Sequence, residues 1–149
     1  EIAISAARVV RLFGFDPKVA FVSHSTFGQP LTSRTKHIKN AVEILKEKNV
    51  NFEFDGDMQP DVALNEEYKN LYPFSKIVGN ANILIMPGQH SAAISYKMMK
   101  TLGDTKVIGP LLIGLGLPIE IAPLRSSTSE ILNLASVAAY SADIIDYKK

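Results

Sequence analysis

Hydrophobic positions along the chain follow two kinds of pattern, helical spacing and short buried runs. A first helix is predicted over residues 2–13, because apolar residues recur there at helical spacing and Gly14 follows as a plausible end. No residue that could cap this helix precedes it, which indicates a piece of a longer protein. The apolar run VAFVS, residues 19–23, then predicts a buried strand.

Strand and helix patterns continue to alternate, about four times in all. Further helices are predicted from about 38 to 48, 61 to 72, 90 to 103 and 127 to 146, and strands within 51–60, 81–87 and 107–124. This order predicts an α/β fold, a layered sheet with helices on both faces. Ligands of such sheets collect beyond the carboxyl ends of the strands, so four loops should share one edge. These loops are 23–30, 55–61, 87–91 and 123–127.

Composition narrows the class of protein. The 149 residues suffice for one domain with a real core, and 46% hydrophobic with 21% charged residues is the profile of a soluble globular protein. A net charge of +1 gives no general basic field, so we expect no nucleic-acid partner. Cysteine is absent, which excludes disulfides and thiolate metal sites and favours a cytoplasmic protein. No apolar run is long enough to span a bilayer, so no membrane partner is expected.

The loop SHSTFGQP, residues 23–30, is a candidate phosphate site. Hydroxyls and a flexible backbone between a strand and a following basic helix can hold an anion, and no Walker-type glycine pattern is present. The residues that would do so are Ser23, Ser25, Thr26 and Gly28. The alternative is an ordinary loop that ends in a helix capped by Thr32 or Ser33.

Acidic and imidazole side chains give weaker signals. Asp55 and Asp57 could share one face if a strand continued through both, but the intervening glycine favours a turn. The three histidines are widely spaced and lack an acid at ligand spacing, so no metal site is expected.

The stretch PLRSSTSEILNLA, residues 123–135, combines a helix start with candidate chemistry. Ser127 and Glu130 have the spacing of a capping box, which explains both residues without a catalytic role. Arg125 and Ser126 lie outside that explanation, and an arginine beside helix N-terminal amides would suit a phosphate. No activating base is positioned near the serines, so locally the cap is the better interpretation.

Taken together, several segments resemble the phosphate acetyl/butyryltransferase family, most closely the phosphotransacetylase-like C-terminal domain of hybrid NADP-dependent malic enzymes. The likeness runs in the family's order from about residue 7 to 142. It is carried by VAFVSHSTFG, DGDMQPDVAL, PFSKIVGNANILIMP, AAISYKMMKTLG, IGPLLIGLGLPI and SSTSEILNLA. The resemblance implies that residues 1–149 are the C-terminal portion of such a domain, with an isocitrate/isopropylmalate dehydrogenase-like fold.

For the site, the resemblance implies transfer of an acetyl group between coenzyme A and phosphate without a metal. Active members have a pattern similar to Ser-Arg-Gly before the last helix, followed by an aspartate that helps to deprotonate the thiol. Here the matching positions are Pro123, Leu124 and Arg125, and Glu130 stands at the acid position. Removing one charge-stabilising donor commonly costs ~10²–10³ in rate, and two are replaced here. The resemblance therefore implies a lost or impaired transferase.

The hypothesis that follows is a regulatory module that responds to acetyl-CoA and contributes to a homo-oligomer. Acetyl-CoA or phosphate would be held by Ser23, Ser25, Thr26, Gly28, Arg125, Ser126 and Ser127. NADP and a divalent metal would belong to an N-terminal part that decarboxylates malate, and this fragment would bind no cofactor. An active phosphate acetyltransferase and a purely structural dimerisation domain are the alternatives.

Overall fold

The computed structural model describes the backbone of residues 1–103 and 106–144, and the side chains through residue 142. The chain divides into two compact units, the first comprising residues 1–95 and the second beginning at residue 96. Helix α5 (Gln89–Leu102) runs across this division. Each unit is described by itself below.

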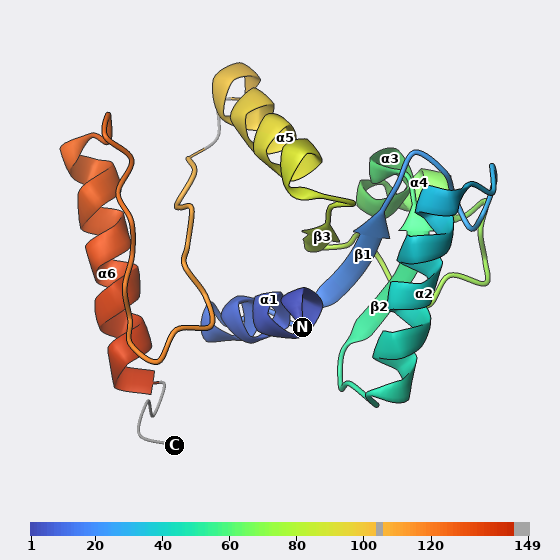
Figure 1. Ribbon diagram of the computed structural model, residues 1–149, viewed down its shortest axis with the longest axis horizontal. Helices are drawn as coiled ribbons and strands as arrows, with labels where there is room; N and C mark the ends of the chain where they lie inside the picture. Colours follow the sequence, from blue (N-terminus) through green and yellow to red (C-terminus); the bar gives the residue numbers. More distant parts are fainter. Residues whose placement is uncertain (104–105, 145–149) are drawn as a thin grey trace. The chain divides into compact units, whose positions relative to one another are not determined.

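The first unit is built on a small parallel sheet (Figure 1). Its strands are β1 (Lys18–Val22), β2 (Glu53–Met58) and β3 (Ile83–Ile85), in the order β2-β1-β3. Both outer strands pair with β1 in parallel, so all three carboxyl ends lie at one edge. The predicted α/β class and the predicted positions of these strands are confirmed.

Helices cover both faces of this sheet, because β1 is apolar on both sides. Helices α1 (Ile2–Leu12) and α2 (Ser33–Glu47) pack on one face, and α3 (Pro60–Leu64) on the other. The first core cluster consists of Ala3, Ala7, Val19, Phe21, Val42, Leu45 and Ile83. The second consists of Ala20, Met58, Val62, Ala63, Ile77 and Ala81.

The helix starts follow the predicted capping. Helix α1 has no side-chain cap at Glu1, as expected from its sequence. Helix α2 is capped by Thr32, whose Oγ1 accepts from Thr35 N at 3.3 Å while Thr32 N donates to Thr35 Oγ1 at 2.8 Å. The two exchanged hydrogen bonds satisfy donors that the first turn of a helix otherwise leaves unpaired.

The single helix predicted over 61–72 is wrong in one respect, since two short helices occupy this region. Helix α3 ends at Leu64 and α4 (Glu66–Lys69) begins after Asn65. The backbone of Asn65 is extended, and its Oδ1 accepts a hydrogen bond from Glu67 N at 2.9 Å. Asparagine competes for backbone donors in this way, which ends one helix and starts the next.

The turn predicted around Asp55 and Asp57 is also wrong, because β2 continues through both residues. Gly56 has φ +149°, and a Cβ built there would lie 2.7 Å from the Cβ and the carbonyl oxygen of Phe21. Glycine is needed here because β1 approaches so closely, and the pairing register shifts between Phe21 and Val22.

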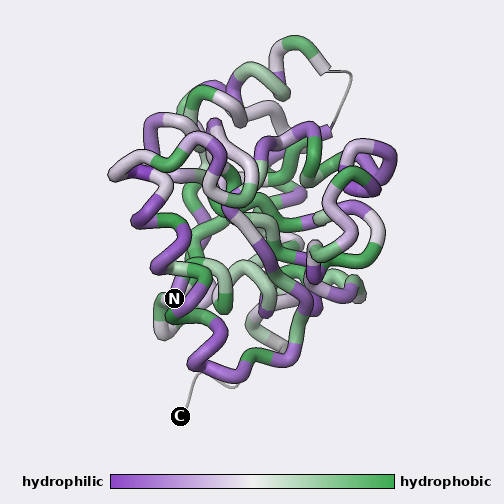
Figure 2. The backbone as a smooth tube through the Cα atoms, turned by 90° about the vertical axis from the view of Figure 1, so that its right-hand side faces the viewer, coloured by the Kyte–Doolittle hydropathy of each residue, from purple (hydrophilic) through white to green (hydrophobic). Residues whose placement is uncertain are grey.

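In the second unit, α6 (Thr128–Ile144) forms as predicted, while the end predicted at Asp146 lies outside the described residues. Leu134 and Val137 of this helix are buried, whereas Ile131 is half exposed. Figure 2 shows hydrophobic and hydrophilic residues interleaved along the helices.

The strands predicted within 107–124 are not found, because the described part of this segment has no regular secondary structure. Its apolar side chains remain about half exposed, as for Ile113 and Ile119. An apolar run forms a strand only where another strand pairs with it and its side chains pack against neighbours. Within the described parts of the chain, no helix is long and apolar enough to cross a membrane.

Candidate functional site

The carboxyl edge of the sheet brings the loops after β1 and β2 together. Ser25 Oγ donates to Asp57 Oδ2, and Gly28 N donates to Asp57 Oδ1 at 3.0 Å. Phe27 N also donates to the backbone oxygen of Asp57 at 2.6 Å. Asp57 and Ser25 are almost completely buried, so a carboxylate at the end of β2 fixes the loop at the end of β1.

The other hydroxyls proposed for phosphate binding also have partners inside the protein. Ser23 Oγ lies 3.3 Å from Ser25 Oγ, and Thr26 Oγ1 accepts from Gln59 N at 3.2 Å. All three hydroxyl side chains are buried. A phosphate at this place would meet the carboxylate of Asp57, so these groups serve first to hold the loop. Their predicted part in ligand binding stays a prediction.

Asp55 and Asp57 lie in the same strand but serve different segments. Asp55 accepts from Gly56 N at 2.9 Å and from Lys76 N at 2.8 Å, whereas Asp57 accepts from the loop after β1. The two acids therefore do not act as a pair. Over residues 1–103 and 106–144, no three histidine, cysteine or acidic side chains are grouped so that they could hold a metal.

An open pocket of about 360 Å³ lies beside the loop after β1. Its polar lining includes Gln29, Gln59 and Asp61, and two tyrosines, Tyr68 and Tyr72, provide aromatic surface. Sequence reasoning named the loops that contain the polar residues but missed the glutamines. It also missed the tyrosines, whose only signal was a place on an amphipathic helical pattern.

Loop 87–91 follows β3 and forms the start of α5. Ser91 Oγ donates to Gly88 O at 2.8 Å. Because β3 is parallel to β1, this loop also lies at the carboxyl edge, as predicted.

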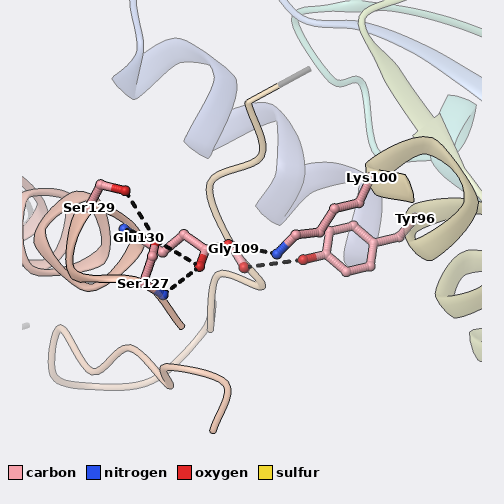
Figure 3. A network of polar contacts seen from close by, with 6 residues as sticks. All are labelled: Tyr96, Lys100, Gly109, Ser127, Ser129 and Glu130. Carbon is pink, nitrogen blue, oxygen red and sulfur yellow. Dashed lines mark hydrogen bonds and ion pairs between the residues drawn. The ribbon is translucent and has the colours of Figure 1, made fainter. Parts of the chain in front are cut away.

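In the second unit, the start of α6 has the geometry of a capping box (Figure 3). Glu130 N donates to Ser127 Oγ at 3.3 Å, and Ser127 N donates to Glu130 Oε2 at 2.8 Å. Ser127 Oγ also donates to Glu130 Oε2 at 3.0 Å. The cap predicted from the sequence is therefore present.

Glu130 has a further partner that the sequence did not indicate. Lys100 Nζ lies 2.6 Å from Glu130 Oε1 and connects α5 with α6 (Figure 3). The hydrogen bonds from Lys100 and Ser127 lower the pKa of Glu130 from its ordinary value to about 2. Thirty positions separate the two residues of this ion pair, and no local pattern distinguishes Lys100 from Lys97, the other lysine of the helix.

The remaining predicted residues of this stretch form a turn. Ser126 N donates to Pro123 O at 2.9 Å, and Leu124 is fully exposed. Arg125 is exposed as well. A common site of Arg125 with the loop after β1 stays a prediction.

The comparisons with known proteins agree on the family. The family model "Phosphate acetyl/butaryl transferase" matches residues 1–139. The chain is 46% identical over 142 residues to an NADP-dependent malic enzyme of Rhizobium meliloti (strain 1021), covering 95% of this chain and 19% of that protein. It is 34% identical over 143 residues to a phosphate acetyltransferase of Bacillus subtilis (strain 168), covering 95% of this chain and 44% of that protein.

Solved structures give the same result. The EutD phosphotransacetylase from Staphylococcus aureus superposes with a TM-score of 0.87 at 31% identity, covering 95% of this chain and 44% of that chain. A phosphotransacetylase from Streptococcus pyogenes has a TM-score of 0.87 at 34% identity, with the same coverage.

The chain thus spans less than half of these transferases and about a fifth of the malic enzyme. In the malic enzymes the matched stretch is the C-terminal part. The chain belongs to the phosphate acetyl/butaryl transferase family, as a phosphotransacetylase-like domain that matches the C-terminal portion of NADP-dependent malic enzymes.

Proposed function

We propose that this chain is a regulatory and assembly module of an NADP-dependent malic enzyme, with a transferase site that no longer works. The environment of Glu130 carries this proposal. Its Oε1 is paired with Lys100 Nζ at 2.6 Å, and its Oε2 accepts two hydrogen bonds from Ser127. The residue at the family's acid position is therefore engaged on both oxygens.

A general base needs a pKa near the working pH and a free oxygen that reaches the proton. With a pKa of about 2, Glu130 is a very weak base toward a thiol at neutral pH. Pro123 and Leu124, at the positions of the family's serine and arginine, can offer no side-chain hydrogen bond or charge. Together these features favour a site that binds acetyl-CoA but does not transfer its acetyl group.

The proposed ligand is acetyl-CoA, acting as an effector. Its phosphates would contact Arg125, whose guanidinium is exposed beside the start of α6, together with Ser126, Ser127 and the loop after β1. Arginine suits this role because its planar donors match phosphate oxygens.

The wider picture extends the same proposal. The complete domain would have the isocitrate/isopropylmalate dehydrogenase-like fold and would assemble as a homo-oligomer. NADP and a divalent metal would belong to the malate-oxidising part of the protein. Similarity to an NADP-dependent malic enzyme at 46% identity supports this placement. The cytoplasmic location stays a prediction.

Two measurements on the intact protein test the proposal. Acetyl transfer from acetyl phosphate to coenzyme A should be negligible, and turnover on the order of 1–10³ s⁻¹, which is typical of enzymes, would instead establish the alternative of an active phosphate acetyltransferase. Acetyl-CoA should bind in a calorimetric titration, and Arg125→Ala should weaken it about tenfold or more.

Arg8→Ala is the matched control, because Arg8 is an exposed arginine in α1. Equal affinities of the wild type and Arg125→Ala would remove Arg125 from the ligand site. Absence of any acetyl-CoA binding would leave only the structural, dimerising alternative.

A further inference from the structure

The pocket beside the loop after β1 has a chemical character that the proposed function does not yet use. Its volume of about 360 Å³ is at the small end of the range for ligand pockets. It can accept one ring system but not a whole coenzyme. All its lining residues belong to the first unit, so the pocket is complete within that unit.

The aromatic side of the pocket offers one fixed ring and one exposed ring. The Tyr72 ring lies 5.4 Å from Phe27 and 6.1 Å from Phe74 between centroids, in tilted and edge-on arrangements. These contacts hold Tyr72 in place. Tyr68 is 47% exposed, so part of its ring is open to solvent and to a ligand. A flat ligand ring could therefore stack on either tyrosine.

The polar side supplies hydrogen-bonding groups of both kinds. Gln59 donates through Nε2 to His24 O at 3.0 Å, which fixes its amide and leaves Oε1 as an acceptor. Asp61 Oδ1 accepts from Val62 N at 3.0 Å, so Oδ2 remains an acceptor. Gln29 is exposed and adds an amide with both a donor and an acceptor.

We propose that this pocket binds the adenine ring of a coenzyme A ligand, an inference that rests on the proposed function. Aromatic faces stack on a purine, a glutamine amide pairs with the N6 and N7 edge of adenine, and a carboxylate accepts from its amino group. An organic cation would need the carboxylate and the rings but not two amides. The charge of Asp61 also keeps phosphates out of the pocket, so they extend away from it.

The experiment uses the intact protein with two probes, acetyl-CoA and adenosine, in calorimetric titrations. Adenosine should bind weakly and compete with acetyl-CoA. Tyr68→Ala should lower the affinity for both probes by the same factor, roughly 5- to 100-fold, which is the range that corresponds to the stacking of one base. Tyr68→Phe should keep the wild-type affinity, because it retains the ring. Gln29→Ala should lower the affinity for both probes by a smaller factor.

Tyr140→Ala is the control, since Tyr140 in α6 is a tyrosine of nearly equal exposure, 48%. Acetyl-CoA binding that neither Tyr68→Ala nor adenosine changes would overturn the inference and leave the proposed function intact. Adenosine binding without acetyl-CoA binding would support the pocket and contradict the proposed effector. If neither probe binds, both proposals fail. A pocket that binds a simple alkylammonium ion but not adenosine would also overturn the assignment to adenine.

Discussion

Replacing Ser25 by alanine removes one hydrogen-bond donor from a buried carboxylate. In the wild type, Asp57 is 2% exposed and receives Ser25 Oγ on one oxygen and Gly28 N on the other. The alanine variant keeps the second donor and loses the first. The hydroxyl of Ser23, which lies 3.3 Å from Ser25 Oγ in the wild type, also loses this contact.

The cost can be estimated from these contacts. A hydrogen bond to a charged group contributes about 1.5–3 kcal/mol. The cavity left by the substitution is negligible, because serine and alanine differ by only one oxygen atom. We expect Ser25→Ala to lower the free energy of unfolding by that amount. For a unit of this size, each kcal/mol corresponds to a fall in Tm of about 4–8 °C.

Urea unfolding followed by circular dichroism measures the change. With a slope of about 1–3 kcal/mol/M, the midpoint should fall by roughly 1 M without a change in slope. Ser91→Ala is the control, because Ser91 Oγ donates to a neutral backbone oxygen, Gly88 O, in the exposed first turn of α5. In the Asp57→Asn background the loss from Ser25→Ala should shrink, since no buried charge remains. A Ser25→Ala variant within about 0.5 kcal/mol of the wild type would refute the reasoning.

Two further predictions concern titratable groups. Lys69 is buried and its Nζ has no hydrogen-bond partner among the described residues, so burial lowers its pKa despite the opposing charge of Glu66. Lys69→Met should stabilise the protein by about 1–3 kcal/mol at neutral pH. The advantage should shrink as pH rises from the lowered folded-state pKa toward 10.5, and it should be smallest above 10.5, where the wild-type amine is neutral in both states. Thermal melts across this range test it, and a pH-independent difference would contradict it. Glu130 has its pKa lowered to about 2 by Lys100 and Ser127, so its contribution is present above about pH 4.5 and is lost as pH falls toward 2. Glu130→Gln should therefore be less stable than the wild type at pH 7 and equal to it near pH 2, and an equal loss at both pH values would show that the charge is not involved.

Local patterns were sufficient to predict most of the first unit. The apolar run of β1 predicted that strand to within one residue, and the period-2 pattern predicted where β2 begins, because burial leaves a direct pattern in the sequence. The end of β2 was predicted too early, at the turn expected around Asp55 and Asp57. The capping box of Ser127 and Glu130 could also be predicted from the sequence, because both partners lie within one helical turn.

The failures depend on groups that are far apart in the sequence. Gly56 indicated a turn, although its actual constraint is the backbone of Phe21, which lies 35 positions earlier. The pairing of Glu130 with Lys100 and the pocket tyrosines depend equally on the folded arrangement. The apolar stretch 107–124 was predicted as strand because hydrophobicity shows that a segment needs a partner, but not whether one is present.

The close approach of β1 to Gly56 has a consequence for attempts to redesign this protein. In a library that randomises residues 55–57, every side chain at the central position would force Phe21 and its strand to move. The two flanking aspartates each hold a different loop, so they would tolerate only replacements that accept the same hydrogen bonds. New function is therefore better sought at exposed positions such as Gln29 and Tyr68, where changes leave the sheet intact.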